Sequence, residues 1–137
     1  MDTHTPEQRR KNMQRIRSKN TVPEKLVMTA LKKRGVYFTK HRKDIFGNPD
    51  IVFKRKKIAI FIDSDFWHCN PKYFTEPKNN SDYWKKKIER NKMRDEEVNI
   101  HLFEKGWTVL RFWESDIKKE VEKIVDIILN TEKVIKP

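Results

Sequence analysis

Residues 49–63, PDIVFKRKKIAIFID, constrain the fold of this chain more narrowly than any other segment. Two β-rich runs, PDIVF and IAIFID, flank the charged stretch KRKK, a pattern that is typical of a β-hairpin. With the turn centred on residues 55–56, Asp50 lies opposite residue 61 or 62. Asp63 then lies one or two places beyond. The hairpin therefore predicts two carboxylates at the same end of two paired strands.

Helical and strand patterns surround this hairpin. The segment TVPEKLVMTALKKRG predicts a helix with Thr21 as a possible cap and Gly35 as its stop. VYFTKH precedes the hairpin as a further strand, and WTVLRFW is another after Gly106. Two more helices are predicted, a long one over about residues 82–105 and an amphipathic one over 115–130. Either Ser115 or Asp116 would cap the second of these, and its core face would be Ile117, Val121, Ile124, Val125 and Ile128.

The order of these elements predicts the fold class. A basic helical arm over residues 1–20 is followed by a helix, three strands, a helix, a strand and a helix. A strand that returns through a helix after a meander gives a mixed β-sheet flanked by helices, an α/β layer fold. The 137 residues suffice for one ordinary domain, which we expect over residues 21–137 after the arm. A loop is expected over residues 70–81.

The charge of the chain indicates its class of partner. A formal net charge of +12 in a sequence with aromatic residues throughout is typical of a folded protein that binds nucleic acid. The alternative is that the lysines only keep the surface soluble. We expect a cytosolic protein, because no long apolar run could cross a membrane and the N-terminus lacks the pattern of a secretory signal. Cys69 is the single cysteine, so neither an internal disulfide nor a cysteine-rich zinc site is expected.

The two hairpin acids are candidate metal ligands. Cross-strand neighbours have Cβ atoms about 5 Å apart and diagonal neighbours about 7–8 Å apart, so Asp50 and Asp63 can share one cation. Mg²⁺ prefers oxygen ligands and keeps several waters, so two carboxylates and the backbone carbonyl of Ile62 would suffice. The alternative is that both acids simply lie at solvated strand ends.

The long helix carries polar residues on an otherwise apolar stripe. The stripe predicts that Asp95 and Asn91 point inward, because they recur at steps of three and four with Trp84, Ile88, Val98 and Leu102. A buried carboxylate needs a partner, and His68 is a candidate because a carboxylate can orient an imidazole that acts as a base. The alternative is a structural aspartate held by nearby arginines or backbone amides. Glu24, in the first turn of its helix, is explained by the helix dipole alone.

The adjacent aromatics Phe66 and Trp67 precede His68 directly. Such a pair is ordinarily buried in a core, but apolar side chains also wedge between bases in proteins that unstack a duplex. Acids on a hairpin, an acid on a helix and a histidine in a basic protein together suggest metal-assisted cleavage of a phosphodiester.

Five segments of the chain resemble, in order and spacing, the motifs of the very short patch repair endonucleases. These segments are NMQRIRSKNTVPE, GNPDIVF, FIDSDFWH, PKNNSDYWKKKIERNKMRD and GWTVLRFWE, and the resemblance covers about residues 9–128. Members of this family are DNA mismatch nicking enzymes with the restriction-endonuclease-like fold. The resemblance therefore implies that fold and that class of activity.

The resemblance also implies roles for individual residues. Asp50 matches the magnesium-binding aspartate, joined by the carbonyl of Ile62, and His68 matches the histidine that activates the attacking water. Asp95 falls where the acid that supports this histidine lies, and Glu24 falls on the acid of the N-terminal helix. Asp63 occupies a position whose role, metal contact or water positioning, stays open. The candidate DNA contacts are Met13, Arg17, Phe66, Trp67, Trp84, Lys85 and Asn91.

One feature of the family pattern is missing. Family members often hold a structural zinc with cysteines and histidine, but here those positions fall on Asp65, on Asn70 or Lys72, and on Ser115. No structural zinc is therefore expected.

We accordingly expect a Mg²⁺-dependent endonuclease, using one or two ions, that nicks double-stranded DNA at or near a T:G mismatch. The alternatives are a restriction or homing nuclease that cuts paired DNA, and a DNA-binding module without catalysis. We further expect a monomer in the bacterial cytosol or nucleoid, with a mismatch-repair helper protein as a candidate partner.

Overall fold

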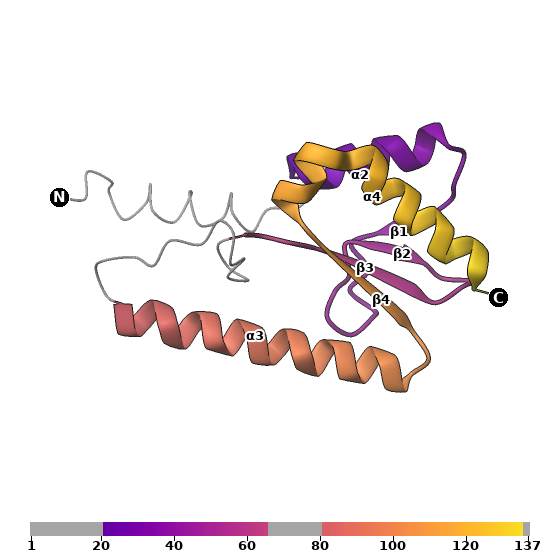
Figure 1. Ribbon diagram of the computed structural model, residues 1–137. Coiled ribbons are helices and arrows are strands. Elements are labelled where there is room, and N and C mark those ends of the chain that lie inside the picture. Colours follow the sequence, from indigo (N-terminus) through magenta and orange to yellow (C-terminus); the bar gives the residue numbers. More distant parts are fainter. Residues whose placement is uncertain (1–20, 66–80, 136–137) are drawn as a thin grey trace.

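The computed structural model describes residues 21–65 and 81–135, and its elements follow the predicted order (Figure 1). The arm predicted over residues 1–20 and most of the loop predicted over residues 70–81 lie outside the described residues. Along the chain the elements are α2 (Val22–Lys33), β1 (Thr39–Lys40), β2 (Ile51–Phe53), β3 (Ile58–Asp63), α3 (Ser81–Glu104), β4 (Thr108–Trp113) and α4 (Glu114–Val134).

The four strands form one mixed sheet in the order β1-β2-β3-β4. β1 pairs with β2 and β2 with β3 in antiparallel fashion, whereas β3 and β4 are parallel. α3 lies between β3 and β4 in the chain and so forms the crossover that parallel strands require. Figure 1 shows α2 and α4 on one face of the sheet and α3 on the other. This is the predicted fold class, a restriction-endonuclease-like α/β fold.

The alternating side chains of β3 divide the core into two parts. Ile58 and Ile60 pack in the cluster that contains the buried residues of α2 and α4. Ala59 and Phe61 pack on the opposite face, with Val98 and Leu102 of α3. Because both faces of β3 are covered, its run IAIFID is apolar almost throughout.

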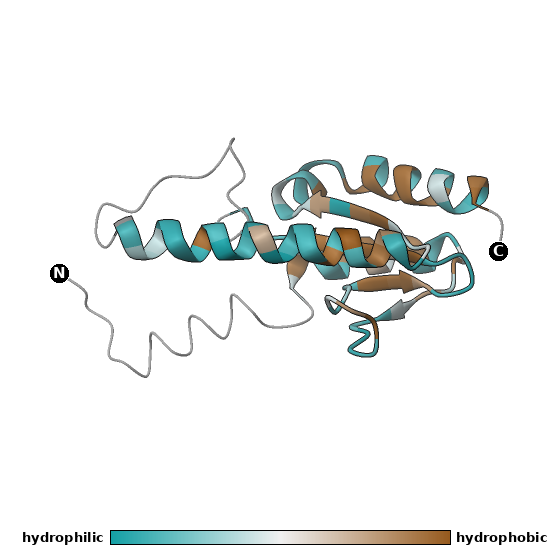
Figure 2. Ribbon diagram, turned by 90° about the horizontal axis from the view of Figure 1, so that it is seen from below, coloured by the Kyte–Doolittle hydropathy of each residue, from teal (hydrophilic) through white to brown (hydrophobic). Residues whose placement is uncertain are grey.

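The predicted inward stripe of α3 is confirmed. Ile88, Val98 and Leu102 are buried, and Trp84, Asn91 and Asp95 are half-buried. The N-terminal half of α3 extends past the end of the sheet at which β3 ends (Figure 1). Figure 2, which views α3 from outside, shows mostly hydrophilic residues along this half of the helix. Part of α3 therefore anchors the core, and part reaches beyond it.

The helix ends differ in detail from their predictions. Thr21 takes the N-cap position of α2 without a side-chain capping bond, and Gly35 ends that helix with φ of +71°. The predicted cap of α4 is wrong, because α4 begins at Glu114 and the N-cap position falls on Trp113. Ser115 does not cap the helix, since its hydroxyl donates to Asp65 Oδ1 at 2.8 Å.

The predicted core face of α4 is confirmed, although the helix is kinked at Glu120, where φ is −138° and ψ is 50°. Its buried residues are Ile117, Ile124, Val125 and Ile128, and Val121 is partly buried against the same cluster. Within residues 21–65 and 81–135, no helix is both long enough and apolar enough to cross a bilayer.

Candidate active site

The hairpin places Asp50 at the end of the sheet, as predicted. Ile51 pairs with Ile60, so Asp50 lies opposite Phe61. The backbone N–H of Asp50 donates to the carbonyl of Ile60 at 3.0 Å, and the N–H of Ile62 donates to Asp50 Oδ2 at 2.8 Å. The carboxylate of Asp50 is therefore held against the backbone of β3, beside the residue whose carbonyl was predicted to share its metal.

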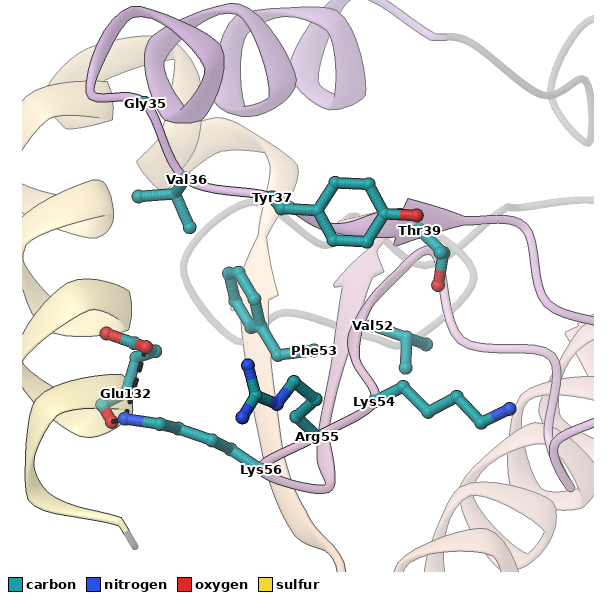
Figure 3. Close-up of a pocket in the computed structure, with 10 residues that line it drawn as sticks. All are labelled: Gly35, Val36, Tyr37, Thr39, Val52, Phe53, Lys54, Arg55, Lys56 and Glu132. Atoms are coloured by element: carbon teal, nitrogen blue, oxygen red, sulfur yellow. Dashed lines mark hydrogen bonds and ion pairs between the residues drawn. The ribbon is translucent and has the colours of Figure 1, made fainter. Parts of the chain in front are cut away.

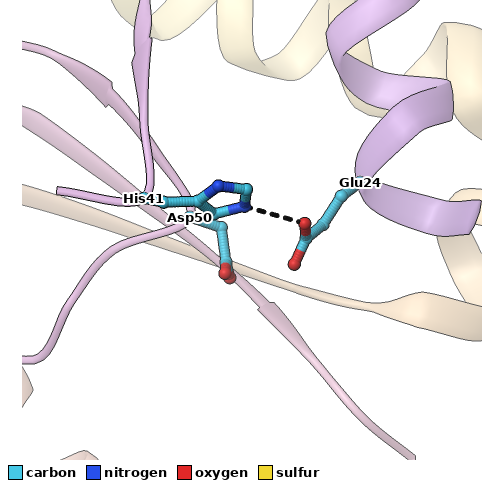
Figure 4. Close-up of side chains that lie close together, drawn as sticks. All are labelled: Glu24, His41 and Asp50. Atoms are coloured by element: carbon cyan, nitrogen blue, oxygen red, sulfur yellow. Dashed lines mark hydrogen bonds and ion pairs between the residues drawn. The ribbon is translucent and has the colours of Figure 1, made fainter. Parts of the chain in front are cut away.

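Glu24 and His41 converge on Asp50 (Figure 4). Glu24 comes from the first turn of α2 and is only 6% exposed. Its Oε2 lies 3.0 Å from Nε2 of His41. One ligand atom from each of these three residues lies within 4.8 Å of the other two. The family resemblance implied that Glu24 does more than complement the helix dipole. In the structure Glu24 lies beside Asp50.

His41 was not among the predicted site residues. It follows β1 directly, and its backbone N–H donates to the carbonyl of Asp50 at 3.1 Å. Its φ of +51° is unusual for a residue other than glycine, and it turns the chain away from the strand at this point. A signal was present in the sequence, because a meander that pairs VYFTKH with PDIVF brings the last residue of one run beside the first acid of the other.

The electrostatics of this cluster favour a cation. Burial raises the pKa of Asp50 to about 7, and the hydrogen bond from the N–H of Ile62 opposes this shift. The negative charges of Glu24 and Asp63 raise the pKa further. Carboxylate oxygens suit Mg²⁺ and Mn²⁺, and an imidazole nitrogen suits first-row transition metals. The cluster of Glu24, His41 and Asp50, hereafter the acidic cluster, therefore fits a divalent metal ion in both charge and ligand chemistry.

Asp63 and Asp95 meet at a different group. Nη1 of Arg111 lies 3.0 Å from Oδ1 of Asp63 and 3.7 Å from Oδ1 of Asp95. Asp95 therefore lies beside an arginine, as the alternative interpretation expected, whereas His68, the partner that we predicted, lies outside the described residues. Arg111 was not predicted. As the single charged residue in the apolar strand WTVLRFW, on the face toward α3, it could have been found from the sequence.

The predicted DNA contacts fall in two groups. Trp84, Lys85 and Asn91 lie on the N-terminal half of α3, where Tyr83 packs edge-on against Trp84 with ring centroids 5.4 Å apart. Nζ of Lys87 lies 5.9 Å from the centroid of each of these two rings. The other predicted contacts, Met13, Arg17, Phe66 and Trp67, lie outside the described residues.

Two positions of the missing zinc pattern, Asp65 and Ser115, lie within the described residues. Asp65 accepts a hydrogen bond from Ser115.

A pocket of about 480 Å³ lies beside the hairpin turn, at the opposite end of the sheet from Asp50 (Figure 3). Glu132, the single acid among the described residues that line it, is ion-paired with Lys56 at 3.2 Å. That pocket therefore lacks the ligands of a metal site.

A mixed sheet between helices, with Asp50 and Asp63 at one end of its two central strands, has the architecture of the restriction-endonuclease-like fold. The family model of the DNA mismatch endonuclease Vsr matches residues 1–73, more than half of the chain. The chain belongs to this family and is an endodeoxyribonuclease.

Individual relatives agree with this assignment. The Type II nicking enzyme V.HpaIIP of Haemophilus parainfluenzae is 46% identical over 128 residues, which span 90% of this chain and 89% of the relative. The Type II nicking enzyme V.NmeDIP of Neisseria meningitidis serogroup C is 46% identical over 121 residues, 87% of this chain and 82% of the relative. The DNA mismatch endonuclease Vsr of Escherichia coli K12 is 34% identical over 126 residues, 91% of this chain and 80% of the relative.

Proposed function

We propose that this protein nicks one strand of double-stranded DNA at a T:G mismatch and that it requires a divalent metal ion, Mg²⁺ in the cell. The observation that carries the proposal is the acidic cluster, two carboxylates and an imidazole in contact, in a chain of the mismatch endonuclease family. The relatives are named as nicking enzymes and as a mismatch endonuclease, which supports the nicking of DNA and a mismatched substrate.

The residues of the acidic cluster have distinct parts in this proposal. Asp50 and Glu24 supply carboxylate oxygens, and Asp50 is oriented by the N–H of Ile62. His41 supplies an imidazole nitrogen, and the carbonyl of Ile62 stays a predicted ligand. A divalent ion held there would neutralise the charge that develops on the scissile phosphate. His68 stays the predicted base that takes the proton from the attacking water, with Asp95 as the acid that supports it.

The positive charge of the chain supports a DNA backbone as the partner. The hydrophilic N-terminal half of α3 projects beyond the end of the sheet at which β3 ends, so Trp84, Lys85 and Asn91 are proposed to contact the same duplex. Met13, Arg17, Phe66 and Trp67 are proposed as the remaining contacts. We propose that the protein acts as a monomer in the bacterial cytosol, with a mismatch-repair helper protein as a possible partner.

The decisive experiment is single-turnover nicking of matched duplexes that differ in one base pair. With Mg²⁺ present, a T:G duplex should be nicked faster than the same duplex with T:A, because a mismatched step costs less to unstack. Removal of Mg²⁺ with a chelator should stop the reaction. Asp50→Asn should lower the rate by at least about 10²-fold, since it removes a metal ligand. Asp126→Asn, at an exposed acid of α4, is the matched control and should nick at the wild-type rate.

Two outcomes would contradict the proposal. Efficient cutting of both strands of a fully paired sequence, with no preference for a mismatch, would favour a restriction or homing nuclease. Undiminished nicking by Asp50→Asn would show that Asp50 is not needed for the reaction and would contradict the proposed role of the acidic cluster.

A further inference from the structure

Arg111 belongs to the strand that pairs with β3 and contacts two of the candidate site acids, Asp63 and Asp95. It lies in the middle of β4, paired in register with Phe61 of β3, and its side chain is 19% exposed. Its guanidinium carbon lies 4.2 Å from the centroid of the Phe61 ring, so the planar group stacks on that ring. The guanidinium therefore has a defined plane, which decides where its N–H groups point.

Two polar side chains accept hydrogen bonds from those N–H groups, and a third forms an ion pair with them. Nη1 donates to Oδ1 of Asp63 at 3.0 Å, and Oδ1 of Asp95 lies 3.7 Å from the same nitrogen. Nε donates to Oδ1 of Asn99 at 2.8 Å. Asp63 belongs to β3, whereas Asp95 and Asn99 belong to α3. One side chain of β4 thus links the neighbouring strand to the crossover helix at two candidate site acids.

We propose that Arg111 is a positioning residue of the nuclease, which holds Asp63 and Asp95 in place and keeps Asp63 out of the metal's ligand set. The proposal rests on the metal site proposed above. The sequence left the role of Asp63 open between metal contact and water positioning. The proposal excludes metal contact. The acids of the site are then divided into two sets, one around the metal and one around Arg111.

The geometry of both sets supports this division. Glu24, His41 and Asp50 bring their ligand atoms together without Asp63, while Oδ1 of Asp63 accepts a charge-assisted hydrogen bond from Arg111. To bind the metal through that oxygen, Asp63 would have to exchange this bond for the metal. A guanidinium at this distance also repels a cation that approaches Asp63. Asp63 and Asp95 are instead placed to accept hydrogen bonds within the site.

The test begins with metal binding, which is measured without DNA. Mn²⁺ is the probe. Its binding is measured by calorimetry and by the electron paramagnetic resonance signal of the free ion. Asp50→Asn should weaken Mn²⁺ binding at least about tenfold, because it removes a ligand. Asp63→Asn should change the dissociation constant by less than about threefold. Arg111→Met should bind Mn²⁺ more tightly than wild type, because it removes a nearby positive charge and releases Asp63.

Nicking is measured on the same variants at saturating DNA and Mg²⁺. Arg111→Met should nick about 10–100-fold more slowly although it binds the metal at least as well, because the two acids lose their orientation. Arg111→Lys should recover part of the rate, since it keeps the charge but not the planar fork. Arg34→Met is the matched control, because Arg34 also bridges two carboxylates, Glu122 and Asp126, but follows the C-terminal end of α2, the opposite end of that helix from Glu24. It should nick at the wild-type rate.

Several results would overturn the role of Arg111. Mn²⁺ binding that weakens about tenfold in Asp63→Asn would make Asp63 a metal ligand, and undiminished nicking by Arg111→Met would remove the positioning role. If thermal melting shows that Arg111→Met does not fold, the role of Arg111 is tested with Asp63→Asn and Arg111→Lys instead. Both variants are then compared with wild type in Mn²⁺ binding and in nicking rate. If Asp50→Asn also keeps wild-type Mn²⁺ binding, the metal site fails instead, and the role of Arg111 is judged by the nicking rates alone.

Discussion

At the scale of single residues, Asp50 combines two opposed properties. It is the candidate metal ligand, and it is also an acid whose pKa burial raises to about 7. An ordinary aspartate in an unfolded chain has a pKa of about 3.9, so the folded protein binds this proton more tightly than the unfolded chain does. Without metal, Asp50 should therefore lower the free energy of unfolding as the pH rises from about 4 to 7, and the loss should persist above pH 7.

This property predicts that a substitution of Asp50, a candidate site residue, stabilises the metal-free protein. At pH 8, Asp50→Asn without metal should melt above wild type by about 5 °C, because it removes a buried carboxylate that is ionised at this pH. Near pH 4 the two proteins should melt together. Added Mg²⁺ should raise the melting temperature of wild type more than that of the variant. The melting temperatures are measured by circular dichroism. An equal or lower melting temperature of the variant at pH 8 would contradict the predicted stabilisation.

At the scale of elements, the loop that leads into Asp50 packs against α3. A Cβ atom added to Gly47 would lie 2.5 Å from Cγ1 of Val98 and 3.0 Å from its Cγ2, and Gly47 has φ of +86°. Gly47 is therefore required both for its backbone conformation and for its lack of a side chain. The close contact ties the loop between His41 and Asp50 to the helix that carries Asp95.

Gly47→Ala should destabilise the protein by about 2–4 kcal/mol, the sum of an unfavourable backbone conformation and a clash with a packed core. Gly35→Ala is the matched control, because Gly35 also has positive φ, +71°, but has nothing within 4 Å of its added Cβ. It should cost only about 1 kcal/mol. Urea denaturation measures both values. A cycle with Val98→Ala should show that the two sites are coupled, and equal costs at the two glycines would contradict the close packing.

At the scale of the whole molecule, charge is distributed unevenly. The chain carries a formal net charge of +12, yet Glu24, Asp50, Asp63 and Asp95 gather around one end of the sheet. Glu24 and Asp50 are suited to a metal, Asp63 and Asp95 face Arg111, and the basic remainder of the chain is suited to a phosphate backbone. DNA binding should therefore be strongly dependent on salt, since each neutralised phosphate releases counterions.

The salt dependence can be assigned to individual lysines. Lys85→Ala, on the projecting half of α3, should weaken binding and reduce the slope of log K against log salt concentration by about 1, without changing the preference for a mismatch. Lys33→Ala, at the C-terminal end of α2, should leave the slope unchanged. Fluorescence anisotropy in Ca²⁺ or without metal measures the slope. A Lys85→Ala variant with the wild-type slope would exclude this part of α3 from the interface.

Features with a short range along the chain could be predicted from the sequence. The element order, the hairpin register that sets Asp50 opposite Phe61, the inward stripe of α3 and the core face of α4 all agree with the structure. These features follow from the two periods of side-chain direction, 2.0 in strands and 3.6 in helices, and from the length of a turn. The start of α4 was mispredicted because Ser115 bonds to Asp65 of a distant segment instead of capping its own helix.

Only the tertiary structure decided which acids share a partner. Glu24 and His41 are 17 residues apart, and Arg111 and Asp63 are 48 residues apart, so no local pattern relates them. Glu24 is explained locally by the helix dipole, and it joins the acidic cluster only because the first turn of α2 packs close to Asp50 and His41. Arg111 meets Asp63 because the parallel crossover sets β4 beside β3, and it meets Asp95 because α3 crosses that same face. Contacts of this kind depend on how elements pack against one another, which the periodicity of a single element does not specify.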